Sequence, residues 1–308
     1  MSKPSSLDLN TPFLSVKQVA EYLQLNEKKV YTLANDGHIP ATKVTGKWMF
    51  PRELIDRWML DSSHSGLLKD RLIIAGSDDP LLYRVVNSFA AQIGSHALIS
   101  YSPTGTGIGL SLLQSQRIDV CGMHWGPQAE SRMRHPALLQ QHAQHRQWVL
   151  IRAFQREQGL IVNPRLLALS KSPEAFFDDQ YRWAMRQKGS GAQRFLMEIL
   201  SRHHKTTDTL SNENETIIAN SEREAAAAIA MNLADIAPGT RSIATEFGLG
   251  FISLGWESFD LALPRNIWFR HLFQEFINEL KSLPSQQMAE TLTGYDLGSC
   301  GELVWGDD

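Results

Sequence analysis

The sequence has 308 residues, about twice the usual length of one domain. Hydrophobic residues make up 43% of it and charged residues 20%, which is typical of a globular protein and excludes a disordered or fibrous chain. No apolar run is long enough to span a bilayer, and the first residues lack the apolar segment of a secretory signal, so we expect a cytoplasmic protein with no membrane partner. The two cysteines, Cys121 and Cys300, have no CxxC spacing, which argues against a zinc site.

The formal net charge of -3 is unevenly distributed along the chain. Residues 1–60 contain 8 Lys and Arg against 6 Asp and Glu, a balance of +2, whereas the remainder contains 22 against 27, a balance of -5. Only the N-terminal part suits a polyanionic partner, and an excess of two positive charges is by itself weak evidence for DNA binding.

Two short capped helices are predicted near the N-terminus. Ser15 precedes an apolar pattern of helical period that ends near Leu23. Asn26 begins a second helix, and Gly37 is expected to end it. On this second helix, Val30, Tyr31 and Leu33 are expected to point inward, and Lys28, Lys29 and Thr32 to be exposed.

A hairpin and a third helix are predicted to follow. Residues 41–44 and 47–50 alternate between apolar and polar side chains, and a Thr-Gly pair joins them, which predicts a tight β-hairpin. Pro51 then opens a helix over residues 52–60, because the fixed φ of proline suits a first helical position.

The string LSVKQVAEYLQLNEKKVYTLANDGHIPATKVTGKWMFPRELIDRWML resembles the excisionase-type branch of the winged helix-turn-helix, MerR-like family. The resemblance implies that residues 26–35 form a recognition helix in the major groove of double-stranded operator DNA, with the hairpin along the adjacent backbone or minor groove. For Tyr31 and Trp48, packing in the domain core is an equal alternative. The DNA-binding residues implied are Asn26, Lys28, Lys29, Tyr31, Thr32, Lys43, Lys47 and Trp48.

A polar stretch at residues 61–66 is the one linker-like segment, so we predict a DNA-binding domain and linker over residues 1–65 and a second domain over 66–308. MerR-type regulators commonly continue into a long dimerising helix. Here a strand-like run, residues 71–75, follows instead, so contacts between copies of the chain are expected elsewhere.

From residue 70 onward, strand-like and helix-like runs alternate, which predicts an α/β domain with a largely parallel sheet. Three junctions rich in Gly, Ser and Thr, at residues 75–80, 102–107 and 186–191, each follow a predicted strand and precede a predicted helix. Backbone amides and the helix dipole suit an anion at such a junction. One junction alone is weak evidence, but three converging on one cleft would form a receptor for an anionic ligand.

The segments AGSDDPLL, SPTGTGIGLSLL, IDVCGMHW, REQGLIVNP, RQKGSGAQRFL, AAAAIAMNLADIAPGTRSIATEFGLGFISL and LTGYDLGSCGELVW resemble, in this order, the type II periplasmic-binding-protein-like domain of bacterial regulators, which is related to molybdate and tungstate receptors. The resemblance implies a bilobed α/β fold, with lobe one at about 70–153 and 257–308 and lobe two at about 154–256. The ligand-binding residues implied are Ser77, Asp78, Thr104, Gly105, Thr106, His124, Arg186, Ser190 and Gly191, with Arg241 and its neighbour Thr240 as a weaker group.

Together these features predict a one-component transcriptional regulator, not an enzyme, with no cofactor and a molybdate- or tungstate-like oxyanion as effector. Ala192 stands where related receptors carry threonine, so a small organic ligand is an alternative, and a molybdenum-cofactor-related binding protein or enzyme is another. No metal site is expected at His135, His142 and His145, because Pro136 interrupts their segment. Two-fold operators make a homodimer or higher homo-oligomer the expected assembly.

Overall fold

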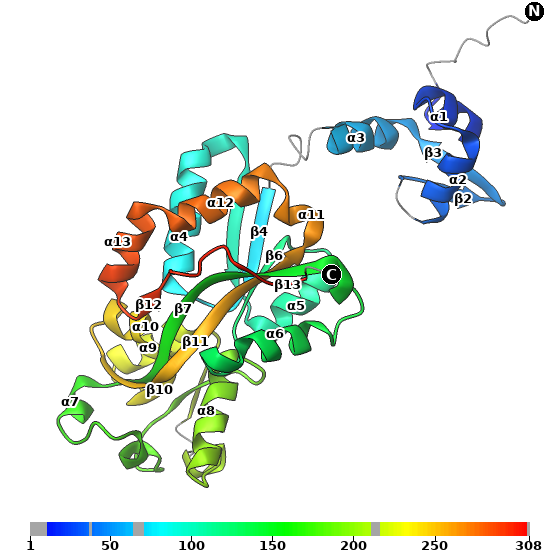
Figure 1. The fold of residues 1–308 in the computed structure, drawn as a ribbon. Helices are drawn as coiled ribbons and strands as arrows, with labels where there is room; N and C mark the ends of the chain where they lie inside the picture. Colours follow the sequence, from blue (N-terminus) through cyan, green and yellow to red (C-terminus); the bar gives the residue numbers. More distant parts are fainter. Residues whose placement is uncertain (1–10, 37–38, 64–70, 211–215, 307–308) are drawn as a thin grey trace, which may run out of the picture. The chain divides into compact units, whose positions relative to one another are not determined.

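The computed structural model describes residues 11–36, 39–63, 71–210 and 216–306, and the chain divides into two compact units, Met1–Asp70 and Arg71–Asp308 (Figure 1). The boundary expected near residue 65 and the helix end expected at Gly37 lie outside the described residues. In the part of the chain that is described, no helix has both the length and the hydropathy needed to cross a bilayer.

The first unit is a small α-rich domain whose helices begin where the sequence provides caps. Ser15 forms a capping box with Gln18, and the side chain of Asn26 accepts a hydrogen bond from the backbone N–H of Lys29 at 2.7 Å. Thr45 and Gly46 both have positive φ, 47° and 81°, as a type I′ hairpin turn requires. The elements are β1 (Phe13–Leu14), α1 (Val16–Tyr22), α2 (Glu27–Asn35), β2 (Thr42–Val44), β3 (Lys47–Pro51) and α3 (Arg52–Ser63).

The core of this unit explains two differences from the sequence-based expectations. Its fully buried side chains include Val19, Val30 and Phe50. Strand β1 was not predicted; it is two residues long and pairs antiparallel with β3 to give the sheet order β1-β3-β2. The prediction that Tyr31 points inward is wrong. Helix α2 turns the face of Val30 and Ala34 to the core, which leaves the Tyr31 side chain 47% exposed.

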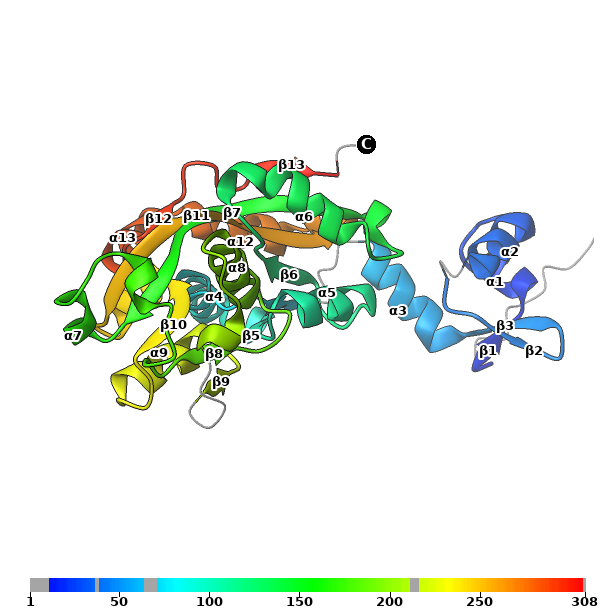
Figure 2. The ribbon, with the colours of Figure 1, turned by 90° about the horizontal axis from the view of Figure 1, so that it is seen from below.

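The second unit is a bilobed α/β domain built on a mixed sheet with the strand order β10-β7-β11-β6-β4-β5 (Figures 1 and 2). Strands β12 and β13 pair with β7, and a separate two-stranded sheet, β8-β9, lies in lobe two. The strands are β4 (Arg71–Gly76), β5 (Leu98–Pro103), β6 (Val120–Met123), β7 (Trp148–Val162), β8 (Ala184–Arg186), β9 (Ile217–Ala219), β10 (Ile236–Thr240), β11 (Gly250–Pro264), β12 (Tyr295–Asp296) and β13 (Leu303–Trp305).

Two strands of 15 residues each, β7 and β11, carry the chain from lobe one to lobe two and back. They pair antiparallel along their length, because the chain leaves along one and returns along the other. The prediction of a largely parallel sheet is therefore right only for β4 with β5 and β6, and for β8 with β9. Arg156 and Glu257 lie opposite each other near the middle of the β7–β11 pair.

Helices pack on both lobes over separate cores. The core of lobe one includes Phe89, Phe154 and Phe276, and that of lobe two includes Phe176 and Trp183. The α-helices are α4 (Pro80–Ile93), α5 (Thr106–Gln114), α6 (Ser131–Leu139), α7 (Pro164–Leu167), α8 (Gly191–Arg202), α9 (Glu222–Ala230), α10 (Arg241–Glu246), α11 (Arg265–Trp268), α12 (His271–Lys281) and α13 (Leu283–Leu292); shorter 3-10 turns are Gly94–His96, Gln128–Glu130, His145–Gln147, Pro173–Phe176 and Thr207–Leu210.

Candidate functional site

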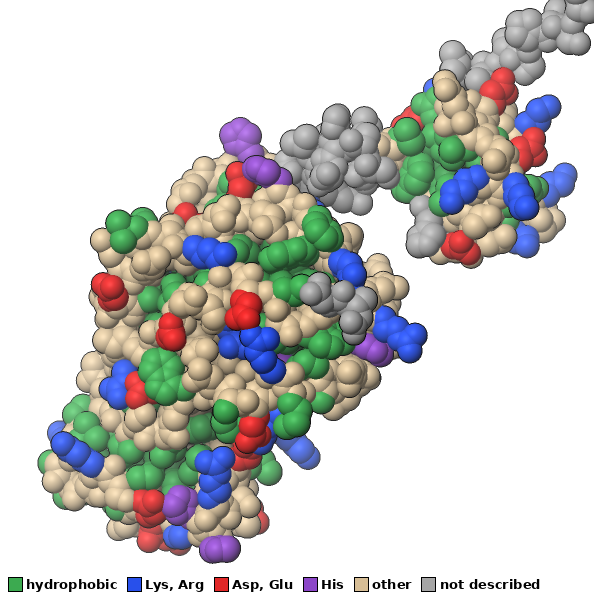
Figure 3. Space-filling model, in the orientation of Figure 1, with side chains coloured by type: hydrophobic (Ala, Val, Ile, Leu, Met, Phe, Trp, Pro, Cys, Tyr) green, Lys and Arg blue, Asp and Glu red, His purple; other side chains and the backbone are tan. Residues whose placement is uncertain are grey.

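The exposed surface of α2 in the first unit carries the side chains expected to contact DNA. Lys28, Lys29, Tyr31 and Thr32 are all exposed, and Figure 3 shows several Lys and Arg side chains standing on the visible face of this unit. The Thr32 hydroxyl donates to the Lys28 carbonyl at 3.0 Å. Asn26 is exposed as well, but its side-chain oxygen is already used as the helix cap.

The hairpin presents two of the expected lysines and explains the ambiguous tryptophan. Lys43 and Lys47 are exposed on β2 and β3. Trp48 is half-buried and packs against the domain core, and the Lys43 ammonium lies 5.6 Å from the centre of its ring. Trp48 therefore packs the hairpin against the core and positions Lys43 through a cation–π contact.

In the second unit, each of the three Gly/Ser/Thr-rich junctions does connect a strand to a helix, at β4–α4, β5–α5 and β8–α8. The first two junctions are joined by a 2.7 Å hydrogen bond between the hydroxyls of Ser77 and Thr106, both buried, and by a bond from the Gly105 N–H to the Gly76 carbonyl. A Cβ on Gly76 would lie 2.1 Å from the Gly122 carbonyl oxygen, so only glycine lets β4 end against β6 at this point.

The third junction meets lobe one through His124. The side chain of Ser190 caps α8 by accepting from the Gln193 N–H, and a Cβ on Gly191 would lie 1.9 Å from His124 Nε2. The absence of a side chain at Gly191 thus lets the buried imidazole of lobe one approach the N-terminus of α8 in lobe two. The two lobes are in contact at this point.

Arg186, at the end of β8, is 5% exposed and only partly satisfied. Its Nη2 donates to the Asn220 carbonyl and its Nε to the Gln187 side chain, while Nη1 has no hydrogen-bond partner. Burial lowers the pKa of the guanidinium from its ordinary value. A buried guanidinium with a free N–H is suited to an anionic group of a ligand.

Arg241, in contrast, lies apart from these residues. It forms an ion pair with Glu157, with 2.9 Å between Nη2 and Oε1, and its guanidinium stacks over Phe251 at 4.7 Å. Glu157 follows Arg156 in β7, and successive side chains of a strand point to opposite faces of the sheet. Arg241 therefore lies on the face of β7 opposite to the cleft. Of this pair, only Thr240 faces the cleft, where its hydroxyl donates to Glu222 at 3.3 Å.

The centre of the cleft is occupied by Arg156, which sequence reasoning missed. This side chain is fully buried, and each of its five N–H donors has a partner. The partners come from both lobes and from the other crossing strand, β11: Glu257 Oε1 at 2.8 Å, Asp79 Oδ2 at 3.0 Å, the Asp78 carbonyl at 2.9 Å, His124 Nδ1 at 3.1 Å and Glu222 Oε1 at 3.4 Å.

The carboxylates outnumber the guanidinium groups in this cluster. Asp78, Asp79, Glu222 and Glu257 are at most 6% exposed, and Arg156 and Arg186 are their two buried cationic neighbours. Burial, partly opposed by Arg156, raises the pKa values of Asp79 and Glu222 and raises the pKa of Glu257 to about 7. Four buried carboxyl groups therefore share two buried guanidinium groups.

His124 is neutral in this environment. Burial and the neighbouring Arg156 lower the pKa of its imidazole well below the ordinary value. Because Nδ1 accepts from the Arg156 guanidinium, the ring proton belongs on Nε2, and that atom has no hydrogen-bond partner. This N–H lies against Gly191 at the start of α8 and has no hydrogen-bond partner there.

Several other buried polar atoms around this cluster lack partners. They are the Asp78 Oδ2, Glu257 Oε2 and Thr104 Oγ1 atoms and both side-chain heteroatoms of Gln158, which lies two residues beyond Arg156 on the same face of β7. A folded protein rarely leaves such atoms unsatisfied, since each costs about 1–3 kcal/mol. Their concentration between the lobes identifies a built polar site.

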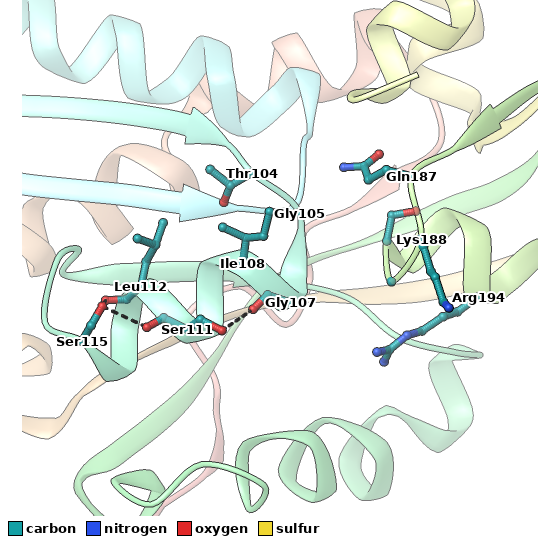
Figure 4. A pocket seen from close by; sticks show the side chains of 12 residues that line it. Thr104, Gly105, Gly107, Ile108, Ser111, Leu112, Ser115, Gln187, Lys188 and Arg194 are labelled. Atoms are coloured by element: carbon teal, nitrogen blue, oxygen red, sulfur yellow. Dashed lines mark hydrogen bonds between the residues drawn. The ribbon is translucent and has the colours of Figure 1, made fainter. Parts of the chain in front are cut away.

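A pocket of about 430 Å³ adjoins this polar site (Figure 4). Thr104, Gly105, Ile108 and Leu112, from the β5–α5 junction and α5, form one wall. The β8–α8 turn and the first part of α8 form the other, and there the side chains of Gln187, Lys188 and Arg194 stand across the pocket from Thr104 and Ile108. Ser190 lines the pocket and directly precedes Gly191, which lies against His124 of the buried cluster, so the pocket and the cluster are adjacent.

Trp125 links the two lobes beside the cleft. The guanidinium groups of Arg134 from lobe one and Arg194 from lobe two both lie over its ring, 5.3 and 5.5 Å from the ring centre. Arg134 also forms an ion pair with Glu198 of lobe two at 2.5 Å. These contacts, called the rim contacts below, hold the lobes together in the form described.

The missed residues leave only a faint signal in the sequence. Strand β7 reads WVLIRAFQREQGLIV, in which Arg152 and Arg156 are buried charged residues. They lie on opposite faces of the strand, because a register shift against β11 falls between them, at Phe259/Asp260. Arg152 pairs with the buried Asp260, which in turn accepts from His135. A charged side chain within a buried strand is the cue that points to Arg156 in β7 and equally to Glu257 in β11, whereas Glu222 carries no cue of this kind.

Residues 87–281 match the PBP superfamily domain, and residues 13–63 match a helix-turn-helix domain. A search of curated proteins found no match.

Solved structures with a similar fold are distant in sequence. A Clostridium perfringens protein solved with bound phosphate is 10% identical, with a TM-score of 0.51 over 73% of this chain and 99% of that one. OxyR of Corynebacterium glutamicum is 13% identical, with a TM-score of 0.49 over 90% of this chain and 89% of that one. The regulatory domain of MetR, a LysR family regulator from N. meningitidis, is 12% identical, with a TM-score of 0.48 over 73% of this chain and 97% of that one.

The family matches agree with the order of elements in the two units. The helix-turn-helix match spans β1 to α3 of the first unit, and the other match includes both crossing strands and the whole of lobe two. Because the match to the PBP superfamily domain covers more than half of the chain, this protein belongs to the PBP superfamily; it also carries a helix-turn-helix domain at its N-terminal end.

Proposed function

We propose that this protein is a cytoplasmic, ligand-responsive transcriptional regulator that binds double-stranded operator DNA and senses a small molecule between the lobes of its second unit. One observation carries the proposal: a single chain joins a helix-turn-helix domain with an exposed basic helix to a PBP domain whose cleft holds unpartnered buried polar atoms. The proposal assigns no catalytic step, cofactor or resident metal to the chain.

Signal transfer would follow from closure of the lobes. A ligand that contacts both lobes binds the closed form better than the open form and so shifts the balance between them. In a homodimer or higher homo-oligomer, that shift changes how two helix-turn-helix domains are presented to a two-fold operator. Closure of the lobes would act on Arg156, which has partners in both lobes, and on the rim contacts.

An anionic group in the ligand is supported by the donors that face the cleft. They are the free Nη1 of Arg186, the Nε2–H of His124, the Thr104 hydroxyl and the N-terminus of the 12-residue helix α8. A molybdate- or tungstate-like oxyanion, the effector favoured by the sequence, would use these donors. Ala192, which stands where related receptors carry threonine, is buried and contributes no hydroxyl.

A small organic ligand is the second candidate, and the carboxylates of the cleft favour it. A bare tetrahedral dianion brings no hydrogen atom to Asp78 Oδ2 or Glu257 Oε2 and would add two negative charges to a site where four carboxyl groups already share two guanidinium groups. Like charges about 4 Å apart repel by roughly 4 kcal/mol at an effective dielectric constant near 20. An organic molecule can carry donors as well as an anionic group.

Capture of genomic DNA by the full-length protein tests the regulator proposal. Sheared DNA from the source organism is passed over immobilised protein, bound fragments are sequenced, and the enriched sequence is titrated by fluorescence anisotropy. We expect enrichment of a two-fold sequence, and loss of binding in a Lys28→Ala/Thr32→Ala double variant. Equal recovery of all sequences, with and without candidate ligands, would refute the proposal.

A further inference from the structure

The unpartnered atoms of the cleft are of two opposite kinds. Arg186 Nη1 and His124 Nε2–H are donors, whereas Asp78 Oδ2 and Glu257 Oε2 are carboxylate oxygens that only accept when ionised. All four side chains are at least nine-tenths buried. A ligand that satisfies both kinds must carry an anionic or acceptor group and also a group with several N–H or O–H donors.

The acceptors lie toward the crossing strands. Glu257 belongs to β11, and the Gln158 side-chain oxygen, also unpartnered, belongs to β7. Asp78 comes from lobe one, and its backbone carbonyl accepts from Arg156 of the same cluster. Three acceptor oxygens from three segments match the three N–H donors of one ammonium group.

The donors lie toward lobe two and the pocket. Arg186 ends β8, and the N-terminus of α8 faces His124 across the lobe boundary. The pocket beyond Thr104 has the apolar side chains of Ile108 and Leu112 on one wall. A carboxylate or similar anionic group fits the donor side, and an extension of the ligand fits the pocket.

We propose that the cleft takes a small zwitterion of the amino-acid type, with a protonated amine held by Asp78, Glu257 and Gln158 and an anionic group held by Arg186 and the N-terminus of α8. This inference rests on the proposed function for the existence of a ligand site and adds the chemical class. It explains why four buried carboxylates face only two guanidinium groups, because the ammonium group of the ligand supplies the missing positive charge.

Thermal unfolding of the full-length protein with matched probes tests this class. The probes are the standard L-amino acids and short ω-amino acids, against sodium molybdate, tungstate, phosphate and sulfate at equal ionic strength. We expect at least one amino acid to raise the Tm in a concentration-dependent way. Its deaminated acid and its decarboxylated amine should each bind roughly tenfold more weakly or worse, because each leaves one set of buried atoms unpaired.

The Asp78→Asn variant separates the zwitterion from an oxyanion, because the two predict opposite changes. Loss of this carboxylate weakens binding of an ammonium-bearing ligand by roughly tenfold, whereas it strengthens binding of a dianion by removing a repulsive charge. Glu290→Gln, which changes an exposed carboxylate on α13, is the matched control and should leave affinity unchanged. The Tm of each variant without ligand reports whether it folds.

Stabilisation by an oxyanion alone, or by no amino acid in the set, overturns the zwitterion inference. Either result leaves the proposed regulator standing if the protein still selects an operator sequence. Conversely, a zwitterion that binds while no DNA sequence is selected overturns the regulator and leaves the ligand class intact.

Discussion

At the scale of single residues, Arg156 is the group on which the second unit most depends. It is fully buried and compensates carboxylates from both lobes, so removing its charge leaves Asp79, Glu222 and Glu257 facing one another in a buried site. Breaking a buried ion pair by deleting one partner typically costs 3–5 kcal/mol, because the remaining charge stays buried without compensation.

We therefore expect Arg156→Met to lower the free energy of unfolding by about 3–5 kcal/mol in urea titrations at pH 7. The matched control is Arg132→Met, whose ion pair with Glu302 is exposed and screened by water, so its removal should change stability little. Equal stability of the Arg156 variant and the native protein would contradict the role given to this residue.

Glu257 gives the cleft a measurable pH dependence. Burial raises the pKa of its carboxyl from 4.5 to about 7 in the folded state, in surroundings formed by Arg156, Glu222, Asp79 and His124. The folded protein holds this proton more tightly than the unfolded chain does. The stabilisation is therefore complete below pH 4.5 and is lost as the pH rises through 7.

In Glu257→Gln this titration is absent, so the variant should gain stability relative to the native protein between pH 5 and pH 8, by an amount on the order of 3 kcal/mol or less. Thermal unfolding across this range measures the difference, with Glu290→Gln as an exposed control. A constant difference between Glu257→Gln and the native protein at all pH values would show that Glu257 does not carry a raised pKa.

Sequence reasoning reached some of these residues and not others, for a physical reason. Gly and hydroxyl residues at strand–helix junctions are local features, so Ser77, Thr106, Ser190 and Gly191 could be placed from the sequence. Arg156, Glu222 and Glu257 come together only when two crossing strands and both lobes are assembled. Arg241 was assigned to the ligand on the same local logic, but the alternation of strand faces brings it to Glu157 instead.

At the scale of elements, α2 and the hairpin of the first unit present Lys28, Lys29, Lys43 and Lys47 outward from a small core. If Lys28 contacts a phosphate group, its removal weakens binding to all DNA sequences alike. We expect Lys28→Ala to reduce the slope of log K against log salt concentration by about 1, and to leave the preferred sequence unchanged.

Anisotropy titrations at several salt concentrations measure that slope. Lys171→Ala, an exposed lysine of the second unit, is the control and should leave it unchanged. An unchanged slope for Lys28→Ala would show that Lys28 does not contact a DNA phosphate group.

Element prediction succeeded where periodicity and caps are local. Ser15 and Asn26 begin α1 and α2, and the Thr45–Gly46 turn joins β2 and β3, as the sequence indicates. It failed for β1, which is too short to show a pattern, and for the antiparallel direction of β7 and β11. That direction depends on the path of the whole chain between two lobes.

At the scale of the whole molecule, the predicted organisation of a small helix-turn-helix domain followed by a bilobed α/β domain is confirmed. The expected assembly remains a prediction. The chain mass is 34.7 kDa, and we expect light scattering coupled to size-exclusion chromatography to give a mass of two or more chains. A mass of a single chain at micromolar concentration would contradict the assembly needed for a two-fold operator.

The central claim is that occupation of the cleft changes affinity for DNA. The most direct test is the Kd for the captured operator fragment, measured by fluorescence anisotropy on the full-length protein with and without a saturating ligand from the thermal screen, for the native protein and for Asp78→Asn. The account predicts a ligand-dependent change of roughly fivefold or more in the native protein, and a matching change in ligand affinity when DNA is bound. It also predicts that the variant needs about tenfold more ligand for the same effect. An operator Kd that is the same with the cleft filled and empty would contradict it.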